Sequence, residues 1–180
     1  MAKVALFTSA LLHTPAGTPE VQGFFDRTGG VVTAAISAPG FLDLTVDAIN
    51  SEPWGAYKIP DYFQKEDYPN RIAQTLSLWR DLDSVFAFTY NGLHAEALSK
   101  RKAWFVRGEW TSYVIWWVDD AHKPGWQEAC ARFDLLHQQG ASAQAFDFKH
   151  PFDAAGQPAA LDRAAIKQLA AHYRKDRRET

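Results

Sequence analysis

Hydrophobic positions along the chain follow two spacings, one typical of strands and one typical of helices. Short, mostly apolar runs rich in β-branched and aromatic residues predict strands at 4–12, 41–46, 75–79, 112–118 and 145–149. Apolar residues that recur every three or four positions predict helices at 18–38, 84–102, 124–139 and 161–174. The predicted order is therefore strand, helix, strand, strand, helix, strand, helix, strand, helix.

The first six of these elements follow the order of a split βαβ unit, which predicts the fold class. We expect an α+β protein with a ferredoxin-like antiparallel sheet and its helices on one face. A sheet covered on one face leaves the other bare, and a bare apolar face is commonly buried against a second copy of the chain. The expected assembly is a homodimer with two sheets face to face, a dimeric α+β barrel.

The segment 47–73 departs from both spacings. It contains three prolines and five large aromatic residues, Trp54, Tyr57, Tyr62, Phe63 and Tyr68. A loop of this length in a compact domain is commonly functional or disordered, and the aromatic content favours order. Two interpretations stay open: a cover over one end of the core, or a lid over a ligand pocket. We treat residues 1–180 as one domain with this insertion, ending in a C-terminal helix and basic tail at 160–180.

Composition and charge exclude several classes of protein. Hydrophobic residues make up 47% of the 180 residues, which is too many for a disordered chain. A formal net charge of −2 argues against a nucleic-acid partner. The single cysteine, Cys130, allows no internal disulfide and fits a reducing compartment. No apolar stretch is long enough to span a bilayer, so we expect a cytoplasmic protein with no membrane partner.

One histidine stands out in the predicted helix 84–102. Helical spacing places Phe86, Tyr90, His94, Leu98 and Arg101 near one line. A single imidazole in such a stripe fits either a packed core or interface residue, or a pocket group that acts as acid, base, hydrogen-bond donor or axial metal ligand. We take His94 and Tyr90 as candidate catalytic residues. The candidate substrate-binding residues are Trp54, Trp79, Phe86, Arg101, Trp104 and Trp116.

Standard catalytic and metal-binding motifs are missing from the sequence. It has no glycine-rich phosphate-binding loop, no paired cysteines and no His-Glu-x-x-His pattern. The six histidines are dispersed, so a structural zinc site is not expected. The expected cofactor is accordingly none or haem, because a single axial histidine on an apolar helix face suffices for haem.

From Thr75 to Phe152 the sequence carries a family pattern. Its elements are Leu78-Trp79, Phe88, His94, the run Arg101 to Phe105, the run Ile115 to Val118, His122, Pro124, Glu128, Arg132, Gly140 and the run Ala145 to Phe148. This pattern resembles the DUF3291 family, which is similar in fold to dimeric α+β barrels of the antibiotic-biosynthesis-monooxygenase type. Those barrels include cofactor-independent monooxygenases, lactone isomerases and haem proteins. The resemblance implies a ligand between sheet and helices, with His94 as a polar group beside it.

Three hypotheses for function follow. The first is a monooxygenase-like or isomerase-like enzyme that acts on a small hydrophobic, aromatic or polyketide-like molecule through His94 and Tyr90. The second is a haem protein with His94 as axial ligand and His122 as the second candidate. The third is a non-catalytic ligand-binding or interaction module, in which the aromatic residues serve only packing and the dimer interface.

Overall fold

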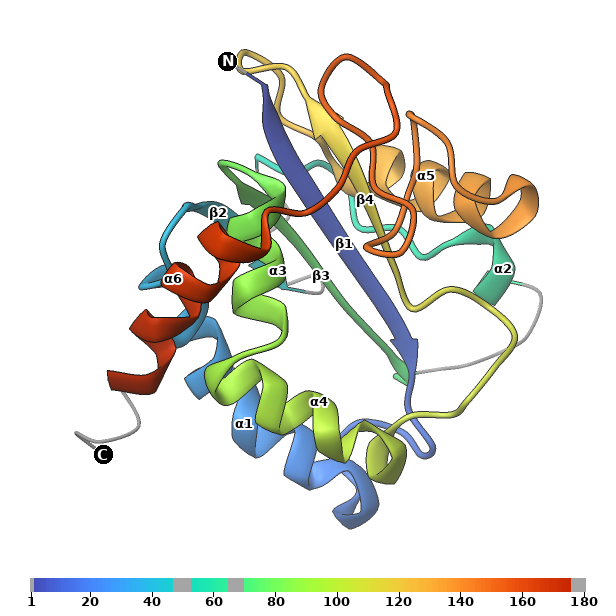
Figure 1. Ribbon diagram of the computed structural model, residues 1–180. Helices are drawn as coiled ribbons and strands as arrows, with labels where there is room; N and C mark the ends of the chain where they lie inside the picture. Colours follow the sequence, from blue (N-terminus) through green and yellow to red (C-terminus); the bar gives the residue numbers. More distant parts are fainter. Residues whose placement is uncertain (1, 47–52, 65–69, 176–180) are drawn as a thin grey trace.

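The computed structural model describes residues 2–46, 53–64 and 70–175 (Figure 1). Its strands are β1 (Lys3–Leu11), β2 (Phe41–Val46), β3 (Ile72–Trp79) and β4 (Tyr113–Val118). Its helices are α1 (Pro19–Ile36), α2 (Asp61–Gln64), α3 (Leu82–Thr89), α4 (Gly92–Trp104), α5 (Trp126–Gln139) and α6 (Arg163–Lys175). None of these helices has the length and apolarity that crossing a bilayer requires.

The four strands form one antiparallel sheet in the order β2-β3-β1-β4. β1 is a central strand that pairs with β3 on one side and with β4 on the other. This is the strand order of a ferredoxin-like unit, so the predicted α+β class and ferredoxin-like sheet are confirmed.

The two faces of the sheet carry separate apolar clusters. Successive side chains of a strand point to opposite faces, so Val4 and Leu6 lie on one face and Ala5 and Phe7 on the other. The first face packs against α3 and α6, with α1 and α4 on the same side of the molecule (Figure 1). The second face packs against α5.

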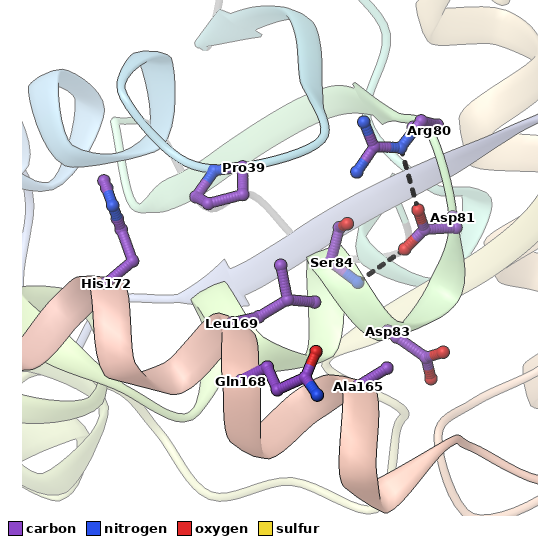
Figure 2. A pocket seen from close by; sticks show the side chains of 9 residues that line it. All are labelled: Pro39, Arg80, Asp81, Asp83, Ser84, Ala165, Gln168, Leu169 and His172. Carbon is purple, nitrogen blue, oxygen red and sulfur yellow. Dashed lines mark hydrogen bonds and ion pairs between the residues drawn. The ribbon is translucent and has the colours of Figure 1, made fainter.

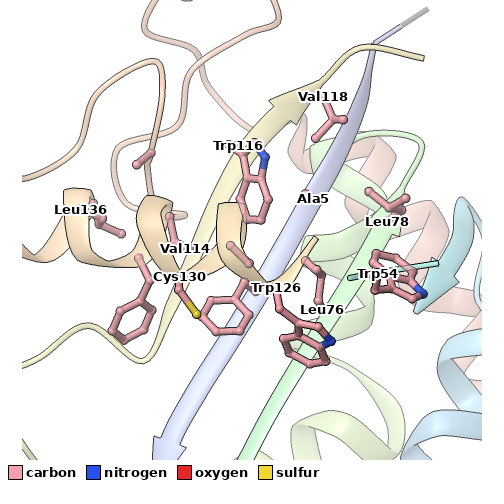
Figure 3. Close-up of a cluster of buried hydrophobic side chains, with 14 of the residues drawn as sticks. Ala5, Trp54, Leu76, Leu78, Val114, Trp116, Val118, Trp126, Cys130 and Leu136 are labelled. Carbon is pink, nitrogen blue, oxygen red and sulfur yellow. The ribbon is translucent and has the colours of Figure 1, made fainter. Parts of the chain in front are cut away.

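The α5-side cluster corrects the expectation that helices lie on one face only. The ring of Phe7 lies 6.2 Å from that of Trp126 and 5.8 Å from that of Phe133, both on α5. Figure 3 shows Trp126 and Cys130 of α5 among the side chains of this cluster. The physical reason is that α5 presents an apolar stripe, Trp126, Ala129, Cys130 and Phe133, all 0% exposed in a single chain. Helices therefore cover both faces of the sheet.

This arrangement removes the argument that suggested a dimer. The apolar side chains of the second face, Ala5, Phe7, Leu11, Leu76, Leu78, Val114, Trp116 and Val118, are 3% exposed or less within one chain. A second copy is therefore not needed to bury them. The homodimer stays a prediction, without the bare sheet face that motivated it.

The described part of the 47–73 segment joins the α5-side cluster. Trp54 and Phe63 are 2% and 1% exposed, and the ring of Phe63 lies 6.1 Å from that of Phe133. This packing favours a cover over the core for residues 53–64. Residues 47–52 and 65–69, which include Tyr68, lie outside the described residues.

Two predicted elements differ in the structure. The expected helix 84–102 is split into α3 and α4 by Tyr90, Asn91 and Gly92, where Gly92 has φ +58°. An Asn-Gly pair favours a turn, and glycine adopts this left-handed conformation at little cost. The expected strand 145–149 forms only isolated bridges, one of which joins Phe146 to Ile115.

Candidate functional site

The helix layer covers β1 completely only along its first half. Val4 and Leu6 are 0% and 6% exposed, whereas Thr8 and Ala10 on the same face are only half-buried. Because β1 has a neighbour on each side, this exposure arises from the face of the sheet and not from an edge. Part of the helix-side face therefore remains open above Thr8.

A row of three hydroxyl-bearing residues crosses the sheet at this level. Thr75 of β3 and Tyr113 of β4 are the register partners of Thr8, and we call the three the Thr8 row. The hydroxyl oxygens of Thr8 and Thr75 are 2.7 Å apart and hydrogen-bonded. All three side chains are half-buried. The open part of the sheet thus presents hydrogen-bonding groups where purely apolar residues are usual.

Aromatic rings border the β4 end of the Thr8 row. The ring of Phe148 lies 5.4 Å from that of Tyr113, 5.1 Å from that of Phe86 and 5.8 Å from that of Tyr90. Tyr90 remains 43% exposed. Rings at these separations favour offset or edge-to-face contacts with a further aromatic group. The arrangement can therefore accept a small aromatic molecule beside the row.

The Tyr113 hydroxyl is prepared to donate a hydrogen bond. Burial raises the pKa of Tyr113 well above its usual range, and the neighbouring Tyr90 adds to the shift. The backbone N–H of Phe148 donates to the Tyr113 oxygen at 3.2 Å. Because that oxygen already accepts one bond and the phenol stays protonated, its O–H can donate, either to the Tyr90 hydroxyl, whose hydrogen bond also raises the pKa, or to an acceptor such as a ligand's carbonyl oxygen.

His94 is held in one tautomer at the start of α4. Its Nδ1 lies 2.8 Å from the carbonyl oxygen of Thr89, which can only accept, so Nδ1 carries the proton. Burial lowers the pKa of His94, and the bond to Thr89 only partly opposes this effect. Nε2 has no hydrogen-bond partner among the described residues. A neutral imidazole with a free Nε2 lone pair can act as a base.

The two candidate catalytic residues flank the same turn but make different contacts. The ring of Tyr90 lies 4.6 Å from that of Phe86, whereas the ring of His94 lies 4.9 Å from that of Phe88. Because the helix breaks at Gly92, the single stripe expected from Phe86 to Arg101 does not form. The sequence expectation of one line is therefore wrong, although both residues stay at the α3–α4 junction.

The candidate substrate-binding residues fall into three places, the first being the helix side of the sheet. Phe86 belongs to the aromatic border of the Thr8 row. Trp79 is 0% exposed, and its ring lies 5.0 Å from that of Phe88, so Trp79 packs against Phe88 inside the core. Its Nε1–H donates to the Ser77 hydroxyl at 2.9 Å, so its one polar group is satisfied.

Trp104 and Arg101 lie farther along α4. The ring of Trp104 packs against α1, 6.1 Å from the ring of Phe24 and 5.4 Å from the guanidinium of Arg27. Arg101 is exposed and donates to the carbonyl of Leu98 on its own helix at 2.9 Å. Trp104 therefore packs α4 against α1, and Arg101 caps a carbonyl group of its own helix.

Trp54 and Trp116 lie on the other side of the sheet. Both belong to the α5-side cluster, where Trp116 donates from Nε1 to Glu128 at 3.0 Å. The Lys123 ammonium lies 4.3 Å from the centre of the Trp54 ring. The sheet separates both tryptophans from His94, so they do not enter the same site.

Sequence reasoning did not select Thr8, Thr75, Tyr113 or Phe148 as site residues. The available signal was the polar pair Thr8 and Ser9 in the otherwise apolar run 4–12. Its meaning depends on which residues of two distant strands stand beside it, and this register is visible only in the folded sheet.

An open pocket of about 390 Å³ lies between α3 and α6 (Figure 2). The charged groups that line it already have partners within the protein. Arg80 pairs with Asp81 at 3.1 Å, and the Asp81 carboxylate caps α3 by accepting the N–H of Ser84 at 2.7 Å. Asp83 accepts the N–H of Asp162 at 3.0 Å, and its partial burial raises its pKa. These contacts identify the pocket as the junction of two helices, and His94 does not line it.

Haem at His94 or at His122 stays a prediction. The ring of Phe88 is 4.9 Å from the imidazole, and neither this pocket nor a second one near residues 149–159 is lined by His94. The Nε2 of His122 is bonded to Glu128 at 2.6 Å, so its ligating atom is engaged. Within the described part of the chain, no group of three or more metal-binding side chains occurs.

Comparison with solved structures finds proteins of low sequence identity. SnoaB, a cofactor-independent oxygenase from Streptomyces nogalater, is 9% identical, with 68% of this chain and 97% of that chain covered and a TM-score of 0.42. A protein of unknown function from Nitrosomonas europaea is 11% identical, with 68% and 93% covered and a TM-score of 0.43. A conserved protein from Methanosarcina mazei is 14% identical, with 64% and 92% covered and a TM-score of 0.44.

The family of the chain follows from its sequence. No curated protein matches it. A family model described as a domain of unknown function, DUF3291, matches residues 3–162, which is most of the chain. The pattern noted between Thr75 and Phe152 lies inside this match. The protein belongs to the DUF3291 family.

Proposed function

We propose that this protein binds a small aromatic molecule over the Thr8 row and carries out monooxygenase-like or isomerase-like chemistry on it. The observation that supports the proposal is the half-buried row itself, in the centre of the sheet and bordered by Phe86, Tyr90 and Phe148. A structural sheet face is normally sealed by its helices, so an open polar row with an aromatic border favours a ligand site.

The expected affinity comes from apolar burial together with directed hydrogen bonds. Burying ~150–250 Å² of aromatic surface contributes roughly 4–6 kcal/mol at ~25 cal/mol/Å². Association itself costs about 4–15 kcal/mol, so apolar contact alone gives weak binding. The hydroxyl of Tyr113 and those of Thr8 and Thr75 then select molecules that carry an acceptor oxygen on the ring system.

In this proposal His94 acts as the base. Its lowered pKa keeps the imidazole neutral near pH 7, and Thr89 leaves the Nε2 lone pair available. Removing a proton from an acidic C–H of the ligand gives a carbanion that Tyr113 stabilises through its O–H. In an isomerisation the imidazolium returns the proton at another carbon. In an oxygenation molecular oxygen adds to the same carbanion, the imidazolium protonates the resulting peroxide, and loss of water from this hydroperoxide leaves a carbonyl group.

Binding is tested with anthrone, an aromatic ketone that has both an acceptor oxygen and an acidic methylene. We expect Tyr113→Phe to weaken binding about 5- to 10-fold, the effect of one neutral hydrogen bond. The matched control is Tyr62→Phe, the same change on the α5 side of the sheet, which should leave the dissociation constant unchanged. Equal effects of the two variants would contradict the placement of the ligand.

Chemistry is tested separately by exchange of the methylene protons in D2O, followed by NMR. We expect the protein to accelerate exchange and His94→Gln to remove about 100-fold or more of that acceleration, as for loss of a general base. Binding without accelerated exchange would overturn the catalytic half of the proposal and leave a ligand-binding module.

A further inference from the structure

A second open pocket, of about 510 Å³, is lined by residues of the segment that joins α5 to α6. Figure 1 shows the course of this segment between the two helices. The walls of the pocket are largely apolar and include Pro151, Phe152 and Pro158. Its polar lining consists of two basic residues, Lys149 and His150. The volume falls within the range of small-molecule sites.

The apolar wall is held in place by the backbone of its own loop. Ala159 donates its N–H to the Pro151 carbonyl at 2.9 Å, and Phe152 and Pro158 form a β-bridge. The Nε1–H of Trp117 donates to the Phe152 carbonyl at 2.7 Å, which fixes the loop to β4. The pocket is therefore formed before any ligand arrives, which lowers the ordering cost of binding.

Asp147 orients the imidazole at the rim. One of its carboxylate oxygens, Oδ1, accepts the backbone N–H of Lys149 at 2.9 Å and that of His150 at 2.8 Å. The same oxygen lies 3.0 Å from His150 Nδ1, so Nδ1 carries a proton. Neither Nε2 of His150 nor the Lys149 ammonium has a partner among the described residues. The Lys149 ammonium is thus left to donate to an occupant, and the His150 ring can add a second donor, Nε2–H, in its protonated form.

The charge balance of the pocket indicates the sign of that occupant. Among the described residues no carboxylate lines it, and Asp147, which lies behind His150, is already engaged by the imidazole and by two backbone N–H groups. In the pocket of Figure 2, by contrast, the lining carboxylate of Asp81 pairs with Arg80. The nearby Asp153 is committed to its loop, because its Oδ1 accepts the N–H groups of Ala155 and Gln157. An anionic group is therefore favoured at the basic rim and an apolar group against the prolines and Phe152.

We propose that this pocket binds a small monocarboxylate with an apolar body. The carboxylate accepts from the Lys149 ammonium and from Nε2–H of the protonated His150 ring, and the apolar body lies against Pro151, Phe152 and Pro158. This site is independent of the Thr8 row, and its occupant need not be a substrate.

The probe is benzoate, titrated into the full-length protein and followed by amide NMR shifts, with hexanoate as the aliphatic counterpart. We expect saturable shifts at Lys149, His150 and Phe152, and about 10-fold or more weaker binding in Lys149→Gln and His150→Gln, as for loss of a charge-assisted hydrogen bond. Lys167→Gln, which removes an exposed cation on α6, should bind benzoate as the unchanged protein does.

Neutral benzamide separates the charge requirement from apolar contact. The proposal expects benzamide to bind at least 10-fold more weakly than benzoate. Equal binding of the two compounds, shifts that concentrate elsewhere, or no effect of Lys149→Gln and His150→Gln would each overturn it. Asp147→Asn keeps an acceptor for both backbone N–H groups and loses the charge behind the imidazole, so a smaller loss than that of His150→Gln is expected.

Discussion

Replacing Phe133 by alanine tests whether α5 completes the sheet within a single chain. Phe133 is 0% exposed, and its ring lies 5.8 Å from that of Phe7 and 6.1 Å from that of Phe63. Truncating a buried phenylalanine to alanine typically costs about 3–5 kcal/mol, because transfer energy is lost and a cavity remains. In a domain of this size each kcal/mol lowers Tm by about 2–4 °C, so we expect a fall of roughly 6–20 °C.

The assay is urea unfolding followed by tryptophan fluorescence, at two protein concentrations tenfold apart. The control is Leu42→Ala on the edge strand β2, which is 51% exposed and should change the free energy of unfolding by less than about 0.5 kcal/mol. If a partner chain covered this face instead of α5, the stability of the unchanged protein would rise with concentration. A loss below about 1 kcal/mol for Phe133→Ala would refute the reasoning, and such a rise beside it would point to a partner chain as the cover.

Three further predictions concern the helix side. Burial lowers the pKa of His94, so between the folded pKa and the usual value of 6.5 the unfolded chain binds more protons than the folded one. The free energy of unfolding should therefore fall as pH drops below about 6.5. His94→Gln should flatten that fall, as measured by urea unfolding at several pH values. Asp81→Ala removes the α3 cap and should cost about 0.5–2 kcal/mol in urea unfolding, while Asp81→Asn should retain most of the stability. Gly40→Ala should lower Tm, because Gly40 has φ +80° and an added Cβ would overlap the Ser84 side chain. Adding Ser84→Gly to Gly40→Ala removes this overlap but not the unfavourable φ, so the double variant should regain part of the lost Tm. Equal Tm values for Gly40→Ala and the double variant would argue against the clash.

The sequence predicted those elements whose limits are set by local chemistry. α1 begins at Pro19, because proline is tolerated in the first turn of a helix. The helix runs through Gly29 and Gly30 to Ile36, and neither glycine has a positive φ. α5 ends at Gly140, which has φ +78°. The predicted strands 41–46 and 112–118 were placed to within one residue.

The errors came from features that depend on distant parts of the chain. The Asn91-Gly92 pair was a visible turn signal, but continuous apolar spacing on either side suggested one helix. Which face of the sheet α5 would cover could not be predicted, because both faces of the strands are apolar. The same limit applies to the site: His94 and Tyr90 were selected from their own helix, whereas the Thr8 row exists only through strand pairing.

The central position of β1 has a consequence for how the chain folds as it is synthesised. β1 occupies residues 3–11, yet its partners β3 and β4 come at 72–79 and 113–118, and α5 covers the second face only after residue 126. Contacts of such sequence separation slow folding, because long loops must close before they form. A nascent chain that ends before Tyr113 leaves one edge of β1 unpaired, which is the kind of edge that templates aggregation. β1 precedes both of its partners in the chain and is thus among the last strands to be fully enclosed.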